Sequence, residues 1–224
     1  MKKIILLSVM GLLMSAANSA ETDALWQKTL TQFKATSAWV AQDIRTQLEA
    51  QRKDQPAKIH YVQSTLSSWD KQNPVYSSIN TDSHWHALPE QKNNADALNK
   101  MIASLDKSKT ELLDGKNIPK RLDNETLDGK NSAVFQLSEG EMGQKITVKM
   151  WVNPDTACLH KMETSLHITL YADADLTSLY AEPNKNGVCL QNQMQGMIDI
   201  QIPFKKAKLN FWQSHGNWVG KPAS

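Results

Sequence analysis

The stretch Lys145–Tyr171, KITVKMWVNPDTACLHKMETSLHITLY, decides the fold. From Lys145 to Val152 apolar and polar residues alternate without a break, which is the period of a strand with one buried face. Asn153–Thr156 supplies turn residues, and alternation then returns from Leu159 to Tyr171, with Thr164 interrupting the apolar side. The stretch therefore predicts a hairpin of two long strands around a short turn. The apolar face of such a sheet needs a cover, and the nature of that cover decides the function.

Other segments add strands to this sheet. Between Trp39 and Arg52, Val40, Ile44 and Leu48 have helical spacing, yet good strand formers are frequent there, so strand and helix both remain open. We favour the strand, because Lys53–Pro56 resembles a hairpin turn. Further strands are expected at Ile59–Leu66, Ala133–Leu137, Cys189–Met194 and Met197–Phe204, and one or two near Leu209, Phe211 and Trp218. The total is seven to nine strands, with turn-rich or loop sequence at Trp69–Tyr76 and Ala172–Gly187.

Two segments have the composition of a helix. Thr22 or Asp23 can cap a helix with the apolar residues Leu25, Trp26, Leu30 and Phe33 at three- and four-residue spacing. A second apolar stripe, Leu98, Met101, Ile102 and Leu105, lies within Asn94–Leu113. The economical fold class is α+β: a large curved antiparallel sheet, or half-barrel, with two main helices covering its concave face.

The N-terminus has the layout of a secretory signal peptide. Lys2 and Lys3 precede an apolar run from Ile4 to Met14 and then small residues, so we expect cleavage near Ala20 and a periplasmic protein. Residues 21–224 are then expected to form a single domain, and no later stretch has the length of a transmembrane helix. The signal holds two of the 25 basic residues and none of the 23 acidic ones, so the remaining chain is formally neutral. This balance gives no electrostatic reason to expect nucleic acid as a partner.

Cys158 and Cys189 are the two cysteines of the chain. An even number of cysteines in an oxidising compartment favours a disulfide, so we expect these two to be bonded. The expected strands make this pairing awkward. If the strands beginning at Cys158 and Cys189 were antiparallel neighbours, their starts would lie a strand length apart. The bond then requires part of the Ala172–Val188 segment to return towards Cys158, or a different strand start.

The sequence contains no established catalytic motif. His84-Trp85-His86 is the one local histidine cluster, and no carboxylate or cysteine stands beside it at ligand spacing, so we expect a surface loop and no metal site. His160 and His167 are expected on opposite faces of one strand. Glu139 and Glu141 lie in a turn flanked by glycines, where solvation accounts for them. We therefore expect a protein that is not an enzyme and that holds no cofactor.

The order of these segments resembles the LolA-like superfamily of periplasmic proteins. The resemblance rests on a signal peptide, one leading helix, the turn Leu127–Lys130 before Val134-Phe135, and the hairpin segment Lys149–Thr156, with Trp69–Tyr76 similar in character. True lipoprotein carriers have an aromatic and Arg-Pro-rich segment in their early strands, and no counterpart lies between Trp39 and Ser68. The chain therefore resembles a member that has diverged from the lipoprotein carriers.

The resemblance implies an incomplete barrel with a helical lid that carries an acylated or otherwise apolar ligand. The candidate binding residues form the apolar file of the expected concave face: Ile146, Val148, Met150, Val152, Met162, Leu166, Ile168, Leu170, Ile198, Ile200 and Ile202. The alternative for this file is an ordinary core that the helices fill. A lipid or acylated molecule is the expected partner.

A different class of function also remains open. The chain can instead be a structural or envelope-assembly protein that works through its surface and binds another envelope protein. The candidate contact residues are then the large aromatic residues Trp69, Tyr76, Trp85 and Trp212.

Overall fold

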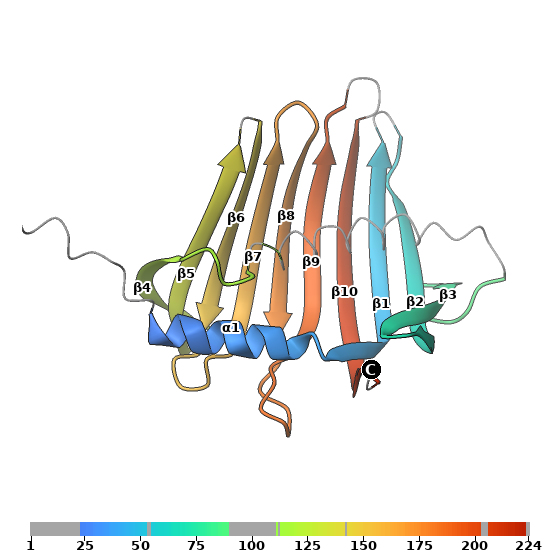
Figure 1. Cartoon of the computed structure of the whole chain (residues 1–224). Helices are drawn as coiled ribbons and strands as arrows, with labels where there is room; N and C mark the ends of the chain where they lie inside the picture. The colour runs from blue at the N-terminus through green and yellow to red at the C-terminus, as the bar shows by residue number, and fades with distance from the viewer. Residues whose placement is uncertain are drawn as a thin grey trace, which may run out of the picture.

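The computed structural model describes residues 23–52, 55–89, 111, 113–141, 143–202 and 206–222. These residues form one antiparallel sheet of ten strands, with a single helix, α1 (Ala24–Thr36), lying across one face (Figure 1). The strands are β1 (Trp39–Arg52), β2 (Lys58–Asp70), β3 (Asn73–Thr81), β4 (Lys120–Leu127), β5 (Lys130–Glu141), β6 (Gln144–Val152), β7 (Leu159–Ile168), β8 (Ala172–Tyr180), β9 (Gln191–Ile200) and β10 (Ala207–Gly220).

The sheet is open. Its strand order is β3-β2-β1-β10-β9-β8-β7-β6-β5-β4, so β3 and β4, which are consecutive strands of the chain, form the two opposite edges. The first and last strands, β1 and β10, pair along almost their whole length, from Trp39 opposite Gly220 to Arg52 opposite Ala207. This long pairing answers the ambiguity at Trp39–Arg52: the segment is a strand, as favoured.

The central hairpin is confirmed, with one change at its far end. β6 and β7 pair with Met150 opposite Met162 and Ile146 opposite Leu166, around the turn that begins at Asn153. The second strand ends at Ile168, three residues before its expected end at Tyr171. A tight turn follows, because the backbone N–H of Tyr171 donates to the carbonyl of Ile168 at 2.9 Å.

Three expected irregular segments are strands. Ala172–Tyr180 is β8, and its inward residues Ala174 and Leu176 were too few and too small to give a clear apolar period. Trp69–Tyr76 belongs to β2 and β3, joined by a tight turn in which Lys71 has a φ of 57°. β4 lies at an open edge, and six of its eight residues are polar or charged, the exceptions being Leu122 and Leu127, so its sequence shows no apolar period.

The C-terminal strands are longer than expected. The sequence predicts two strands, Cys189–Met194 and Met197–Phe204, but one strand, β9, runs from Gln191 to Ile200 through Gly196. Ile202 follows its end, and Phe204 lies outside the described residues. Ten strands therefore replace the seven to nine that were expected.

Helix α1 begins where the sequence predicted. The side chain of Asp23 accepts hydrogen bonds from the backbone N–H groups of Leu25 (2.8 Å) and Trp26 (3.3 Å), which caps the first turn. The second expected helix, Asn94–Leu113, falls almost wholly outside the described residues. The expectation of two covering helices is therefore not supported: the described part of the chain is mostly β, with one helix. None of its helices is long and apolar enough to cross a membrane.

Candidate functional site

The face of the sheet against which α1 lies, called the helix face below, carries two apolar clusters. The first, called the helix cluster, consists of buried residues from α1, the segment before β4 and strands β5 to β7: Trp26, Leu30, Leu113, Ala133, Phe135, Leu137, Val148, Met150, Val152, Leu159 and Met162. The second, called the sheet cluster, has the buried members Ala174, Met194, Ile198 and Phe211, with Leu48, Leu166, Leu176, Ile200 and Leu209 packed against them. The two clusters differ in what fills them.

Side chains of α1 fill the helix cluster. The ring of Trp26 packs on Phe135 with the centroids 5.4 Å apart, and Trp26 is only 2% exposed. Leu30 lies one turn further along the helix and is also buried. This part of the helix face is therefore an ordinary core, which was the alternative for the apolar file.

The sheet cluster is made of strand residues alone, so far as the described part of the chain goes. Strand register brings its members together in two rows. One row runs Leu176, Gly196, Phe211 and Leu48 across β8, β9, β10 and β1, and the other runs Leu166, Ala174, Ile198 and Leu209 across β7 to β10. Paired residues of an antiparallel sheet share a face, so both rows belong to the helix face.

Gly196 lets the first row close up. A Cβ at this position would lie 2.6 Å from Cδ2 of Leu176 and 3.0 Å from Cε1 of Phe211. The large side chains on either side therefore occupy the space above the glycine. The result is an apolar surface that is continuous from β8 to β10. In the sequence, the only signal of this surface was the lone glycine within an otherwise regular strand.

The predicted ligand file is divided between these clusters. Val148, Met150, Val152 and Met162 belong to the helix cluster, with Ile146 packed against it. Leu166, Ile198 and Ile200 belong to the sheet cluster. Ile168 is half-buried at the end of β7. Leu170 and Ile202 lie in turns outside the strands and are 78% and 38% exposed, so they do not continue the file.

Polar side chains border the sheet cluster on the helix face, and the sequence did not reveal them as a group. Gln213 of β10 donates from Nε2 to Oγ1 of Thr46 on β1 at 3.0 Å, and both residues are buried. Further along, the hydroxyls of Ser64 and Ser78 lie 2.7 Å apart. A ligand on the sheet cluster would therefore have apolar surface beneath it and hydroxyl and amide groups at one border.

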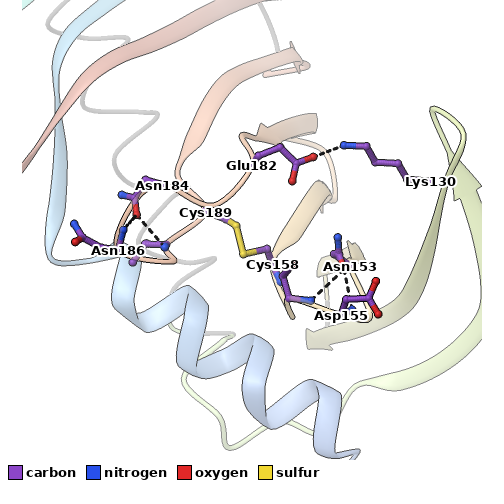
Figure 2. The surroundings of a disulfide bond; sticks show 10 residues. Lys130, Asn153, Asp155, Cys158, Glu182, Asn184, Asn186 and Cys189 are labelled. Carbon is purple, nitrogen blue, oxygen red and sulfur yellow. Dashed lines mark hydrogen bonds and ion pairs between the residues drawn. A yellow bond between two sulfur atoms is a disulfide. The ribbon is translucent and has the colours of Figure 1, made fainter.

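The disulfide forms as predicted, by the first of the two expected routes. Cys158 and Cys189 are bonded, with their Cα atoms 5.8 Å apart (Figure 2). β8 lies between β7 and β9 in the sheet, so β7 and β9 run in the same direction and both begin at the same end. The segment after β7 thus returns towards Cys158 as a full strand, which places the two cysteines side by side.

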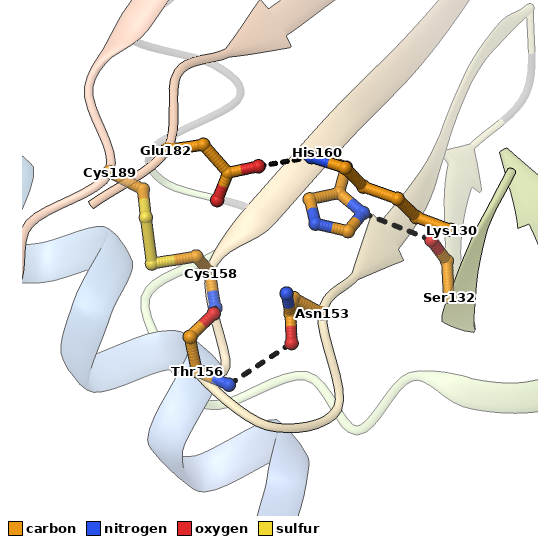
Figure 3. Close-up of polar contacts among 8 residues, drawn as sticks. All are labelled: Lys130, Ser132, Asn153, Thr156, Cys158, His160, Glu182 and Cys189. Atoms are coloured by element: carbon orange, nitrogen blue, oxygen red, sulfur yellow. Dashed lines mark hydrogen bonds and ion pairs between the residues drawn. A yellow bond between two sulfur atoms is a disulfide. The ribbon is translucent and has the colours of Figure 1, made fainter. Parts of the chain in front are cut away.

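Next to the disulfide, Ser132 and His160 form a polar pair (Figure 3). Nδ1 of His160 lies 3.1 Å from Oγ of Ser132, while its Nε2 is buried without a hydrogen-bond partner among the described residues. Burial lowers the pKa of His160, and nearby Lys130, which is paired with Glu182, lowers it further. Ser132 is 0% exposed. A substrate cannot reach this hydroxyl, so the pair does not present a nucleophile.

A β-bulge corrects the expectation for the two histidines. Trp151 lies opposite Lys161 but Val152 lies opposite Leu159, so His160 is an extra residue in β7. The bulge turns the His160 side chain towards Ser132. Ser132 lies on the same face of β5 as Val134, the partner of Trp151, and on the opposite face from Ala133 of the helix cluster. His160 and His167 therefore share the outer face of the sheet, although the alternation placed them on opposite faces.

The cluster His84-Trp85-His86 is a loop held by Asp82. The backbone N–H groups of His84 and His86 donate to Oδ1 of Asp82 at 2.8 and 2.9 Å, and the bond from His86 is the main cause of a lowered pKa of this carboxyl group. The described residues contain no group of three side chains that could hold a metal ion. The prediction of a surface loop is confirmed.

Comparisons with known proteins place the chain at a distance from those already described. No protein-family model and no curated protein sequence matches it. Similar solved structures include a DUF1329 family protein from Desulfovibrio piger, with 13% identity and a TM-score of 0.39 over 89% of this chain and 92% of that one. They also include a LolA superfamily protein from Nitrosomonas europaea, with 12% identity and a TM-score of 0.35 over 91% and 94%. The second belongs to the superfamily that the sequence resembles.

The four aromatic residues proposed as surface contacts divide into two groups. The hydroxyl of Tyr76 donates to the carbonyl of Ala41 at 2.7 Å, and partial burial raises its pKa. The ring of Trp85 contacts the ring of Tyr61 edge to face, and Cζ of Arg45 lies 5.4 Å from the centroid of the Trp85 ring. These two residues hold parts of the chain together. Trp69 and Trp212 are half-buried and keep some free surface.

Proposed function

We propose that this protein is an exported, non-enzymatic carrier that binds an acyl chain or a similar apolar ligand on the sheet cluster. The observation that supports the proposal most directly is the composition of that cluster. Nine apolar residues of five strands line one surface, and no described residue outside the sheet joins them. Four of them are buried and the other five are partly buried, and an apolar sheet face of this kind is suited to an elongated apolar molecule.

Three further observations support the details. The helix cluster is filled by α1 and stabilises the fold, so the sheet cluster can serve binding. Met194 within the cluster is an adaptable side chain that accommodates different apolar shapes. The disulfide and the signal-like N-terminus both suit the periplasm.

Titration with a fluorescent fatty acid tests this proposal. We expect saturable binding to protein freed of lipid, and displacement by an unlabelled fatty acid. Phe211→Ser removes the largest side chain of the sheet cluster and is expected to weaken binding about thirtyfold, because one buried aromatic side chain contributes on the order of 2 kcal/mol.

Ile79→Ser is the matched control. Ile79 is 47% exposed on β3, opposite Gln63, and belongs to neither cluster, so this substitution also removes a large apolar side chain but is expected to leave binding unchanged. If the unmodified protein binds no fatty acid and its native mass spectrum after purification from the envelope shows no lipid, the carrier proposal is wrong.

A further inference from the structure

The connection between β7 and β8 and the end of β9 lie at the end of the sheet farthest from α1 (Figure 1). Leu170 and Tyr171, in the turn between β7 and β8, are 78% and 58% exposed, and Ile202 after β9 is 38% exposed. Backbone hydrogen bonds hold these turns in one row. The N–H of Gln201 donates to the carbonyl of Tyr171, and that of Thr169 donates to the carbonyl of Gly143, both at 2.8 Å. The exposed side chains therefore stand on a continuous, ordered edge.

Leu170 is unfavourable at its position in two ways. It is the third residue of the turn Ile168–Tyr171 and has a φ of 67°, where glycine or asparagine is favoured. It also holds almost its whole side chain in water. A residue with a strained backbone conformation and an exposed side chain does not stabilise the fold. Residues in strained conformations are concentrated at functional sites.

Basic residues flank this apolar edge. The sequence segments 52–58 and 201–206 contain five basic residues and one acidic residue, although the chain without its signal is formally neutral. Arg52, Lys58 and Lys206 are exposed and form no ion pair with any described residue. The nearest acidic residues are engaged elsewhere: Asp173 lies 2.5 Å from Nδ1 of His167, and Asp199 lies 3.9 Å from Nζ of Lys208.

We propose that this edge, called the tip row and formed by Leu170, Tyr171, Ile202, Arg52, Lys58 and Lys206, docks on a membrane surface that contains anionic lipids. Exposed leucine, isoleucine and tyrosine side chains enter the boundary between headgroups and acyl chains, while flanking basic residues contact anionic headgroups. A protein partner would be expected to bring carboxylates to the cations, but it does not account for an exposed leucine at the outermost turn. The proposal goes beyond the carrier function and does not depend on it.

Flotation with lipid vesicles tests the proposal on the exported chain. We expect the protein to float with vesicles of phosphatidylcholine mixed with phosphatidylglycerol, and less with vesicles of phosphatidylcholine alone. Binding to the mixed vesicles is expected to fall as salt is added, because salt screens the exposed cations. If the protein floats with neither kind of vesicle, the proposal is wrong. This holds even if crosslinking captures a protein partner through the tip row.

Variants separate the apolar contribution from the basic one. The double substitution Leu170→Asn and Tyr171→Ser is expected to reduce vesicle binding about tenfold or more, because it removes both inserting side chains. Asparagine tolerates a positive φ, so this variant is expected to melt no lower than the unmodified protein. The substitutions Arg52→Gln and Lys206→Gln are expected to remove the preference for the anionic vesicles.

The same Ile79→Ser substitution serves as the control, since Ile79 is exposed but lies in the middle of β3. If it reduces flotation as much as the double substitution at Leu170 and Tyr171 does, insertion is not specific to the tip row and the proposal is wrong. Fatty-acid binding is expected to be unchanged in the double variant. If a protein floats with the vesicles but does not bind fatty acid, this result contradicts the carrier function and leaves the tip-row proposal standing.

Discussion

The indole ring of Trp26 and the ring of Phe135 lie 5.4 Å apart, centroid to centroid, with their planes inclined at 41°. This contact joins the one described helix to β5 within the helix cluster. Both rings are almost fully buried. The contact therefore fixes α1 on the helix face and separates the filled part of that face from the sheet cluster.

Trp26→Ala is expected to lower the free energy of unfolding by about 3 to 5 kcal/mol, because the substitution leaves a large cavity between α1 and β5. Urea denaturation followed by circular dichroism measures the change. Gln27→Ala, at an exposed position of the same helix, is expected to change it by less than about 0.5 kcal/mol. Equal effects of the two substitutions would show that α1 does not pack on the sheet in this way.

Gly196→Ala is expected to destabilise the protein by about 1 to 3 kcal/mol, because the new methyl group overlaps the side chains of Leu176 and Phe211. Thermal denaturation checks the direction of the change. Gly216→Ala is the matched control, since no atom lies within 4 Å of the position that its Cβ would take on β10. A Gly196→Ala protein that is as stable as the control would contradict the close packing of the sheet cluster.

The disulfide is expected to leave no titratable thiol in the unfolded, unreduced protein. Replacing both cysteines by alanine is expected to cost about 3 to 4 kcal/mol of stability, since the bond restricts a loop of about thirty residues in the unfolded chain. The single substitutions leave a free thiol and are expected to lose the same stability. Two titratable thiols in protein purified without a reductant would contradict the bond.

His160 is expected to make stability depend on pH in mildly acidic solution. Its pKa in the folded protein is lowered, so the unfolded chain binds more protons in the range between that pKa and the ordinary value near 6.5. Stability is therefore complete above the ordinary value and falls as the pH drops below it. Urea denaturation at a series of pH values from about 7.5 to about 5 measures this fall.

His160→Gln removes the titrating group and keeps a polar side chain beside Ser132. The difference in unfolding free energy between the unmodified protein and this variant is expected to shift in favour of the variant as the pH falls. Lys130 and Glu182 face His160 and are present in both proteins, so their charges cancel in the comparison. A difference that is the same at every pH would show that His160 is not held in its neutral form.

Strand-forming residues with a following turn predicted β1, a capping residue predicted the start of α1, and the even number of cysteines predicted the disulfide. Alternation of apolar and polar residues was sufficient to predict the central hairpin. Alternation failed where both faces of a strand carry small or polar residues, as in β8, and where an edge strand is highly charged, as in β4. In β8 the stability comes from two neighbouring strands that supply the hydrogen bonds and the contacts of Leu176, and those neighbours are distant in sequence. Tertiary pairing of this kind leaves no local period.

The candidate site could be predicted only in part, for a similar reason. The sequence correctly grouped Leu166, Ile198 and Ile200 as residues of one face, but it could not separate them from Met150 and Met162, which lie beneath α1. It missed Phe211 and Leu48 as members of the same surface, because the pairing of β1 with β10 joins opposite ends of the chain. It also placed Leu170 within a strand, since a turn that begins at Ile168 does not interrupt the alternation.

The position of the disulfide has a consequence for the order in which the chain folds. The bond spans 31 residues and encloses β7 and β8 completely, so it ties together the starts of two strands that are not neighbours. With only two cysteines in the chain, an oxidant cannot create a wrong intramolecular pair. Once the bond has closed, β8 shares a short ring with its partner β7, and its other partner, β9, begins two residues after Cys189. The closed ring therefore lowers the entropy lost in pairing these three strands. Early oxidation would thus turn this part of the sheet into a local folding nucleus.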